Sequence, residues 1–146
     1  MDKLQEYFDL LPHCILKFQY IEEGLRFCLY RCHGVVAIKL KGTIPYKAPL
    51  QSIEKAAMGK LINLYQSFTD DKDFIKSLNS VKAKRDHIAH QGYVLTVEEQ
   101  HNDDFVAEKL KELNDALAEF ESCYEKLSAK MAEIDKLVNN VANEKT

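Results

Sequence analysis

The sequence predicts an all-α protein, an up-and-down, mostly antiparallel bundle of four to five helices that ends in a long C-terminal helix. Glycine and proline are scarce, with 5 and 3 copies among 146 residues, so few turns interrupt the chain. Apolar residues recur at intervals of three and four along most of the sequence, which is the period of one helix face. No repeat or linker divides the chain, and residues 1–146 are therefore expected to form a single helical domain.

The first half of the chain is expected to contain two main helices separated by a loop. Helical spacing covers the first 36 residues, with Pro12 near the start of that helix and a short leading helix over Lys3–Leu10. Two of the three prolines fall within Lys39–Pro49, which predicts a loop. A second helix is expected over Leu50–Phe68. Its apolar face is formed by Ile53, Ala57, Leu61 and Leu64.

The second half is expected to hold a third helix over Asp73–His90 and a longer last one. Gly92 is placed to end the third helix, because glycine readily adopts the left-handed cap conformation. The segment Thr96–Glu99 has the form of a capping box that opens the last helix. That helix would span about 60 Å, longer than a compact bundle needs, so its C-terminal half is a candidate for pairing with a second chain. Its apolar stripe comprises Val106, Leu110, Leu113, Leu117, Phe120, Tyr124, Leu127, Met131, Ile134, Val138 and Val141.

The overall charge indicates a protein without a general attraction to nucleic acid. The formal net charge is −3 and the pI is about 6.0, so any basic footprint must be local. No apolar run of membrane-spanning length and no secretory leader pattern is present, and we expect a soluble, cytoplasmic protein that does not bind membranes. The four cysteines are then expected to be reduced.

The sequence predicts no metal site and no cofactor. Cys28 and Cys32 are four residues apart on one helix, without the short Cys-x-x-Cys knuckle that is typical of zinc sites. The cysteines are better explained as small core residues. A P-loop, a dinucleotide fingerprint and a nucleophile elbow are all absent from the sequence.

Two charged residues interrupt the predicted apolar faces. Glu22 falls between Phe18 and Leu25 on the inner face of the first helix, and Arg85 precedes Ile88 on that of the third. A charge on a buried face is costly unless it is paired. One interpretation is a Glu22–Arg85 ion pair that fixes the register of the helices. Another places Arg85 at the floor of an anion-binding cleft, and the two interpretations are compatible.

His90 follows Arg85 by five residues, which turns an ideal helix by about 140°. The two side chains therefore meet only if the arginine wraps round, the helix distorts or a second chain contributes. Asp86 precedes His90 by four residues and shares its face, so it could accept the Nδ1–H and leave Nε2 for chemistry. His87 and Tyr93 stand in the same segment as candidate supporting residues.

The segment Arg85–His90 resembles the Arg-x(4–6)-His motif of the HEPN superfamily, helical domains of many prokaryotic toxins and defence ribonucleases. The common form is Arg-Asn/Asp-x-x-Ala-His, which the chain matches at four positions, late in the third main helix. The segment Met58–Ile62 is also similar to a Leu-Gly-x-Leu-Ile stretch that some members carry in the preceding helix. The specific motif covers six residues, and the architectural likeness covers most of the chain.

This resemblance implies a metal-independent endoribonuclease of a toxin–antitoxin or phage-defence system, with a composite site where two protomers meet. Arg85 and His90 would be catalytic, with Glu22 bracing Arg85. Lys82 and Lys84 would contact RNA, as part of a basic footprint on that helix. The products would be a 2′,3′-cyclic phosphate and a 5′-hydroxyl. The implied partners are a second copy of the chain, RNA and an antitoxin protein.

The resemblance leaves two alternatives open. Inactive HEPN domains serve as modules that bind nucleotide, RNA or protein, and a purely structural helical protein could use its long last helix to recruit a partner. Some members carry an Arg-x4-His-x-Tyr motif whose tyrosine is modified by a nucleotidyltransferase antitoxin. Tyr93 comes one residue later than that tyrosine, after Gly92, so the resemblance does not extend to this form of regulation.

Overall fold

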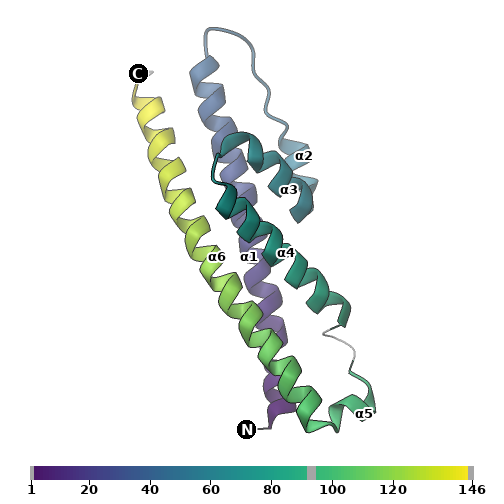
Figure 1. Ribbon diagram of the computed structural model, residues 1–146. Helices are drawn as coiled ribbons and strands as arrows, with labels where there is room; N and C mark the ends of the chain where they lie inside the picture. Colours follow the sequence, from purple (N-terminus) through teal and green to yellow (C-terminus); the bar gives the residue numbers. More distant parts are fainter. Residues whose placement is uncertain (1, 92–94, 145–146) are drawn as a thin grey trace.

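The computed structural model describes residues 2–91 and 95–144, and every regular element in these residues is helical. The prediction of an all-α fold with a long C-terminal helix is therefore confirmed (Figure 1). The elements are α1 (Lys3–Leu40), α2 (Leu50–Lys55), α3 (Met58–Tyr65), the 3-10 turn η1 (Gln66–Phe68), α4 (Lys72–Gln91), α5 (Val97–Gln100) and α6 (Asp103–Glu144). None of the described helices combines the length and apolar composition needed to cross a bilayer.

The two long helices α1 and α6 run parallel to one another, within a bundle that the sequence predicted to be mostly antiparallel (Figure 1). Phe18 meets Phe120 at a ring-centroid distance of 6.1 Å, and further along both helices Arg31 Nε lies 3.3 Å from Asp135 Oδ1. The paired residue numbers rise together, which is the mark of parallel helices. The pair forms the spine against which the shorter helices pack.

The C-terminal half of α6 has its partner within the same chain. Lys39 pairs with Glu144 near the far ends of the two helices, at 3.1 Å. Gly24 allows the close approach, because a Cβ atom at this position would lie 2.7 Å from Cδ2 of the buried Leu127. The length of α6 is therefore matched to α1, which accounts for the extent of the apolar stripe without a second protomer.

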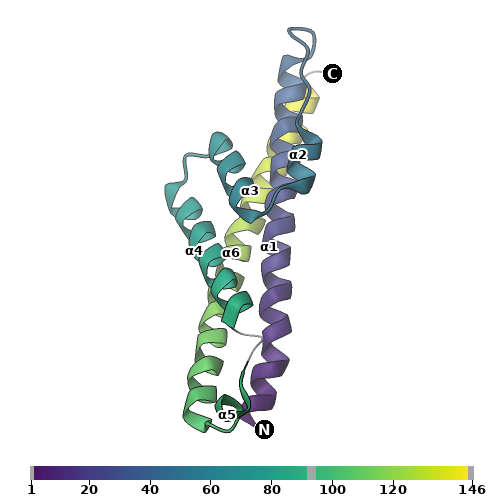
Figure 2. The same ribbon diagram turned by 90° about the vertical axis from the view of Figure 1, so that its right-hand side faces the viewer.

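Helix α4 runs antiparallel to both members of the α1–α6 pair (Figure 2). Near its start Asp71 pairs with Lys130 of α6 at 2.9 Å, and near its end His87 faces Glu112 at 3.9 Å. The start of α4 is capped by Asp71, whose carboxylate accepts a hydrogen bond from the amide of Phe74 at 3.0 Å. The sequence predicted this helix to within one residue at each end.

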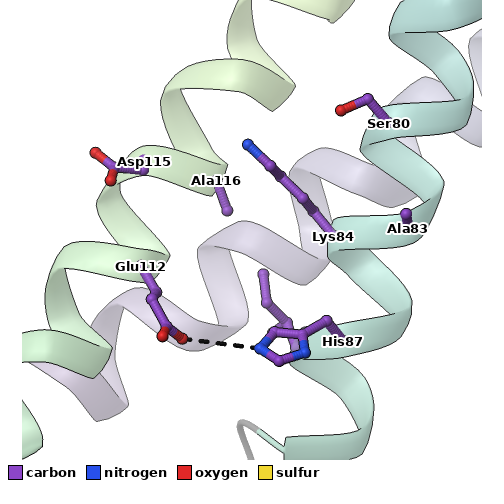
Figure 3. A pocket seen from close by; sticks show the side chains of 8 residues that line it. Ser80, Ala83, Lys84, His87, Glu112, Asp115 and Ala116 are labelled. Carbon is purple, nitrogen blue, oxygen red and sulfur yellow. Dashed lines mark ion pairs between the residues drawn. The ribbon is translucent and has the colours of Figure 1, made fainter.

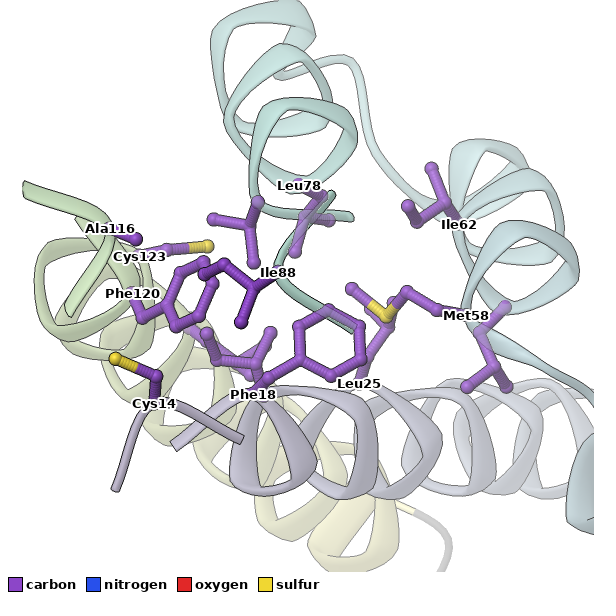
Figure 4. Close-up of a cluster of buried hydrophobic side chains, with 14 of the residues drawn as sticks. Cys14, Phe18, Leu25, Met58, Ile62, Leu78, Ile88, Ala116, Phe120 and Cys123 are labelled. Atoms are coloured by element: carbon purple, nitrogen blue, oxygen red, sulfur yellow. The ribbon is translucent and has the colours of Figure 1, made fainter. Parts of the chain in front are cut away.

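A single hydrophobic cluster joins α1, α2, α3, α4 and α6 (Figure 4). Ile88 of α4 is buried in it, close to the residues proposed for chemistry. Side chains that are fully buried include Phe18, Ile21, Leu25, Leu29, Ile53, Leu61, Ile62, Leu78, Val81, Phe120 and Leu127. The cluster fixes the position of α4 along α1 and α6, and so fixes which of its side chains reach solvent.

The structure corrects the predicted leading helix, because α1 is continuous and holds Pro12 in its interior. Proline has no N–H to donate to the carbonyl one turn earlier, so one hydrogen bond of the helix is lost. Tyr7 and Leu11, in the turn just before Pro12, are almost fully buried. Their burial stabilises the helical path across Pro12, and Lys3–Leu10 is part of one long helix.

The predicted helix over Leu50–Phe68 is wrong, because the chain breaks between α2 and α3. Ala56 is extended, with φ −71° and ψ 135°. The guanidinium of Arg26 donates hydrogen bonds to the carbonyls of Ile53 (3.1 Å) and Ala56 (2.8 Å). The carbonyl of Ile53 also accepts from the amide of Ala56 at 3.3 Å, so Arg26 adds a second donor there and supplies one to the carbonyl of Ala56. These bonds hold the end of α2 and the break in place.

The predicted capping box is present, but it opens only the short α5. Thr96 Oγ1 accepts from the amide of Glu99 at 3.1 Å, and α6 begins later, where Asn102 Oδ1 accepts from the amide of Phe105 at 3.1 Å. Helix α6 is therefore capped by a second residue that the sequence analysis did not single out. Gly92, predicted to end α4, lies outside the described residues.

Candidate functional site

The residues of the HEPN-like motif stand on the last two turns of α4. The helix is continuous through Arg85–His90, so the five-residue step between the arginine and the histidine separates their side chains by about 140°. Arg85 turns toward α1, whereas His90 is exposed on the outer side of the helix. One chain therefore does not bring these two side chains together on one face.

Arg85 lies at the edge of the core rather than within it. Its side chain is 42% exposed, and its guanidinium carbon lies 5.0 Å from the centre of the Phe18 ring. Nη1 is 3.2 Å from Oδ1 of Asp86. The aromatic face and the carboxylate restrain the head group, while its partial exposure leaves the guanidinium accessible to an anion. The prediction of a buried arginine is therefore wrong.

Asp86 is held by cations on α4, not by His90. Lys82 Nζ lies 3.0 Å from Asp86 Oδ2, and Arg85 donates to the other carboxylate oxygen. The hydrogen bond from Lys82 lowers the pKa of Asp86 below its usual value and, together with the hydrogen bond from Arg85, outweighs the opposing effect of burial. The predicted Asp86–His90 hydrogen bond is absent, so Asp86 orients the arginine instead. Lys82 and His90 are both four residues from Asp86, so spacing does not distinguish them. The lysine carries a permanent positive charge, and this favours it over the histidine as the partner of the carboxylate.

The predicted Glu22–Arg85 ion pair is also wrong. Glu22 Oε1 lies 3.3 Å from Nη2 of Arg26, one turn along the same helix. Arg26, whose side chain is only 11% exposed, also pairs with Glu23 and is the partly buried cation that Glu22 contacts. The i, i+4 spacing of a glutamate and an arginine was visible in the sequence and could have identified this partner.

Gly59 of the second HEPN-like stretch lies beside this cluster. A Cβ atom there would lie 3.2 Å from Cε of Lys82, so the absence of a side chain lets the lysine stem pass between α3 and α4. Met58 and Ile62, in the same stretch, are buried in the core. The second HEPN-like stretch therefore lies beside the stem of Lys82, three residues before the motif begins at Arg85.

His87 lies on a different side of α4, in a groove of about 480 Å³ between α4 and α6 (Figure 3). Its Nε2 faces Glu112 of α6 at 3.9 Å. The groove is lined by Ser80, Ala83, Lys84, His87, Ile88, Glu112, Asp115 and Ala116. Neither Arg85 nor His90 lines it, so His87 is separated from the residues that it was expected to support.

Both lysines that were predicted to contact RNA have carboxylate partners. Lys82 pairs with Asp86, and Lys84 pairs with Glu119 of α6. Burial raises the pKa of Glu119, but hydrogen bonds from Lys84 and Ser80 outweigh this and hold the pKa below its usual value. Lys84 is therefore engaged at the groove, and only Lys82 belongs to the cluster around Arg85.

The remaining candidate groups lie in the core or outside the described residues. Burial raises the pKa of Cys28 to about 12 and that of Cys14 to about 11, so neither thiol is a ready nucleophile. Among residues 2–91 and 95–144, no three His, Cys, Asp or Glu side chains gather as a metal site would require. Tyr93 lies outside the described residues.

Comparisons with family models, with curated proteins and with solved structures gave no match to this chain.

Proposed function

We propose that this chain is a metal-independent endoribonuclease of HEPN type that works as a homodimer, with Arg85 and His90 in a composite site. The observation that carries the proposal is the solvent exposure of these two side chains on α4. Arg85 and His90 lie on adjacent turns next to a packed core, and neither side chain is buried in that core. The six-residue motif that they define has the form found in HEPN ribonucleases.

The chemistry assigned to the site is an internal transesterification of RNA. A base removes the proton of the 2′-hydroxyl, whose oxygen attacks the neighbouring phosphorus, and an acid protonates the departing 5′-oxygen. The bond from phosphorus to the 5′-oxygen breaks, which leaves a 2′,3′-cyclic phosphate and a 5′-hydroxyl. Histidine suits both roles because it gains and loses a proton near neutral pH.

The number of histidines supports a two-chain site. Each chain supplies one His90, whereas the reaction uses one base and one acid. A twofold dimer supplies two such rings, and it can also offer the Arg85 of one chain to a phosphate held near the His90 of the other. This arrangement overcomes the separation of about 140° within a single α4.

The role proposed for Arg85 is to stabilise the charge that develops on the phosphorane oxygens. Its planar head group suits two oxygens of a phosphate, and a preorganised donor stabilises a transition state more than a mobile one does. Phe18 and Asp86 supply that preorganisation. Lys82 acts through Asp86, so it is a positioning residue.

The central test measures cleavage of single-stranded RNA in the presence of EDTA. Arg85→Ala and His90→Ala are each expected to reduce the rate by about two orders of magnitude or more, with unchanged helicity. Arg31→Ala and His13→Ala are the matched controls, because Arg31 is 44% exposed and His13 is also exposed, both on α1. Cleavage that survives both α4 substitutions, or that the control substitutions reduce equally, contradicts the proposal.

The composite nature of the site has its own test. A large excess of the His90→Ala chain should suppress wild-type cleavage, because most wild-type chains are then in mixed dimers that contain only one His90. If a single chain formed a complete active site, the wild-type chains would keep their full cleavage activity in the mixture. Sedimentation equilibrium on both chains provides the control that the variant still associates.

A second function is favoured by the geometry of Arg85 alone. A restrained, solvent-facing guanidinium is sufficient to bind a phosphate, and binding needs no contribution from His90. A non-catalytic module would show no cleavage but a measurable affinity for RNA or nucleotide, lost in Arg85→Ala and kept in both His90→Ala and Arg31→Ala.

A further inference from the structure

The groove between α4 and α6 has a floor made for an apolar side chain. Ala83 of α4 and Ala116 of α6 line it with single methyl groups (Figure 3), and the buried Ile88 is a further apolar lining residue. Two small residues on neighbouring helices leave a space of about 480 Å³, within the size range of binding pockets. The space opens to solvent beside the exposed imidazole of His87.

An acidic stripe runs along α6 beside this floor. Its four members recur at intervals of four, three and four, which places them on one side of the helix: Glu108, Glu112, Asp115 and Glu119. Within the described part of the chain, Glu112 and Glu119 have cationic partners, but Glu108 and Asp115 have none. The rim therefore carries an excess of negative charge that a cationic partner would offset.

The charge also excludes a phosphate backbone as the occupant. Lys84 is already paired with Glu119, and the hydroxyl of Ser80 donates to the same carboxylate. An RNA strand laid along this side of α6 would meet the carboxylates of Glu108 and Asp115, which no cation offsets among the described residues. RNA is thus directed away from the groove.

From these observations we infer that the groove is the docking site for a basic amphipathic helix of a partner protein. One apolar side chain of the partner enters between Ala83 and Ala116, and lysines or arginines on the adjoining turns meet the acidic stripe. Helices bind grooves in this way when anchors at helical spacing match an apolar cleft. The inference does not depend on ribonuclease activity, because neither Arg85 nor His90 lines the groove.

The test uses a synthetic helical peptide of about fifteen residues with one leucine and lysines on the turns beside it. A twin peptide carries glutamates in place of the lysines. The readout is the methyl NMR signals of Ala83, Ala116 and Ile88 in the full-length chain. The lysine peptide should shift these signals saturably, with an affinity that falls as salt is added, and the glutamate twin should not.

Two variants measure separately how much the apolar floor and the acidic rim contribute to the affinity for the peptide. Ala83→Leu fills the floor and should weaken binding by about tenfold or more. Asp115→Lys reverses one rim charge and should weaken it by about fivefold. Both positions are exposed, so circular dichroism should report an intact fold. Glu121→Lys is the matched control, an exposed acid about 120° round α6 from Asp115, and should leave the affinity unchanged.

Several results would overturn the inference. Equal losses in Asp115→Lys and Glu121→Lys would show unspecific attraction, and full binding by Ala83→Leu would show that the floor is unused. If Ala83→Leu instead reduces self-association in sedimentation experiments, the occupant is a second copy of the chain. If an RNA oligonucleotide shifts the same methyl signals, the occupant is nucleic acid.

Discussion

The guanidinium of Arg85 lies 5.0 Å from the centre of the Phe18 ring, so a residue at the heart of the core supports the arginine of the candidate site. Phe18 in turn contacts Phe120 at 6.1 Å. The relationship links the packing of α1 against α6 to the position of a functional side chain on α4.

We predict that Phe18→Leu and Phe120→Leu separate stability from function. Both rings are buried in the same contact, so each substitution should lower the free energy of unfolding by about 1–2 kcal/mol. Only Phe18→Leu removes the aromatic face beneath Arg85, and it should weaken binding of RNA or phosphate as well. Urea denaturation and a binding titration on both variants check the split. Equal affinity in the two variants would contradict the role assigned to Phe18.

Arg26→Ala should be among the most damaging substitutions of a charged residue. It would remove the side-chain hydrogen bonds to the carbonyls of Ile53 and Ala56 and leave Glu22 without its cation, at a cost of about 2–4 kcal/mol in the free energy of unfolding. Arg31→Ala, which breaks an exposed pair with Asp135, should cost less than about 1 kcal/mol. Urea midpoints of the two variants provide the comparison, and similar midpoints would rule out the capping role of Arg26.

The pKa of Asp86 should depend on its hydrogen bond from Lys82. Its pKa in the folded chain lies below the ordinary value of 3.8, chiefly because Lys82 donates to it. Lys82→Met should therefore move the pKa of Asp86 upward, as measured by NMR titration of the carboxyl carbon. Lys109→Met, which removes a cation from Glu112 instead, should leave the Asp86 titration in place.

The same shift has a consequence for stability as the pH changes. A lowered pKa in the folded state means that ionised Asp86 stabilises the fold above pH 3.8, and that this contribution disappears as the pH falls through the lowered value. The wild type and Asp86→Asn should therefore differ most above pH 3.8 and converge in stronger acid. A difference that widens on acidification would show the opposite sign of coupling.

Two glycines of α1 should respond to alanine in opposite ways. Gly24→Ala would place a methyl 2.7 Å from the buried Leu127, and we expect a loss of about 1–3 kcal/mol in the free energy of unfolding. Gly34→Ala meets no atom within 4 Å and gains the helix propensity of alanine, worth about 0.5–1 kcal/mol. Thermal melts of both variants check the signs.

Regular periodicity made α4 and the apolar stripe of α6 predictable, because each depends on side chains within the element itself. The break between α2 and α3 was not predictable in this way, since it depends on Arg26 reaching across from α1. The predictions of charged pairs were wrong for a related reason. Glu22 pairs with Arg26, one turn away, and not with the distant Arg85. Asp86 pairs with Lys82, one turn away, and not with His90.

The parallel course of α1 and α6 has a consequence for how the chain folds. Helix α1 leaves the ribosome well before its main partner α6, so contacts such as Phe18–Phe120 close a loop of about one hundred residues. Until α6 emerges, the apolar side of α1 has no long partner and is open to aggregation or to chaperones. The α1–α6 pair can therefore form only after α6 has been synthesised, and α1 is vulnerable during the translation of the residues between them.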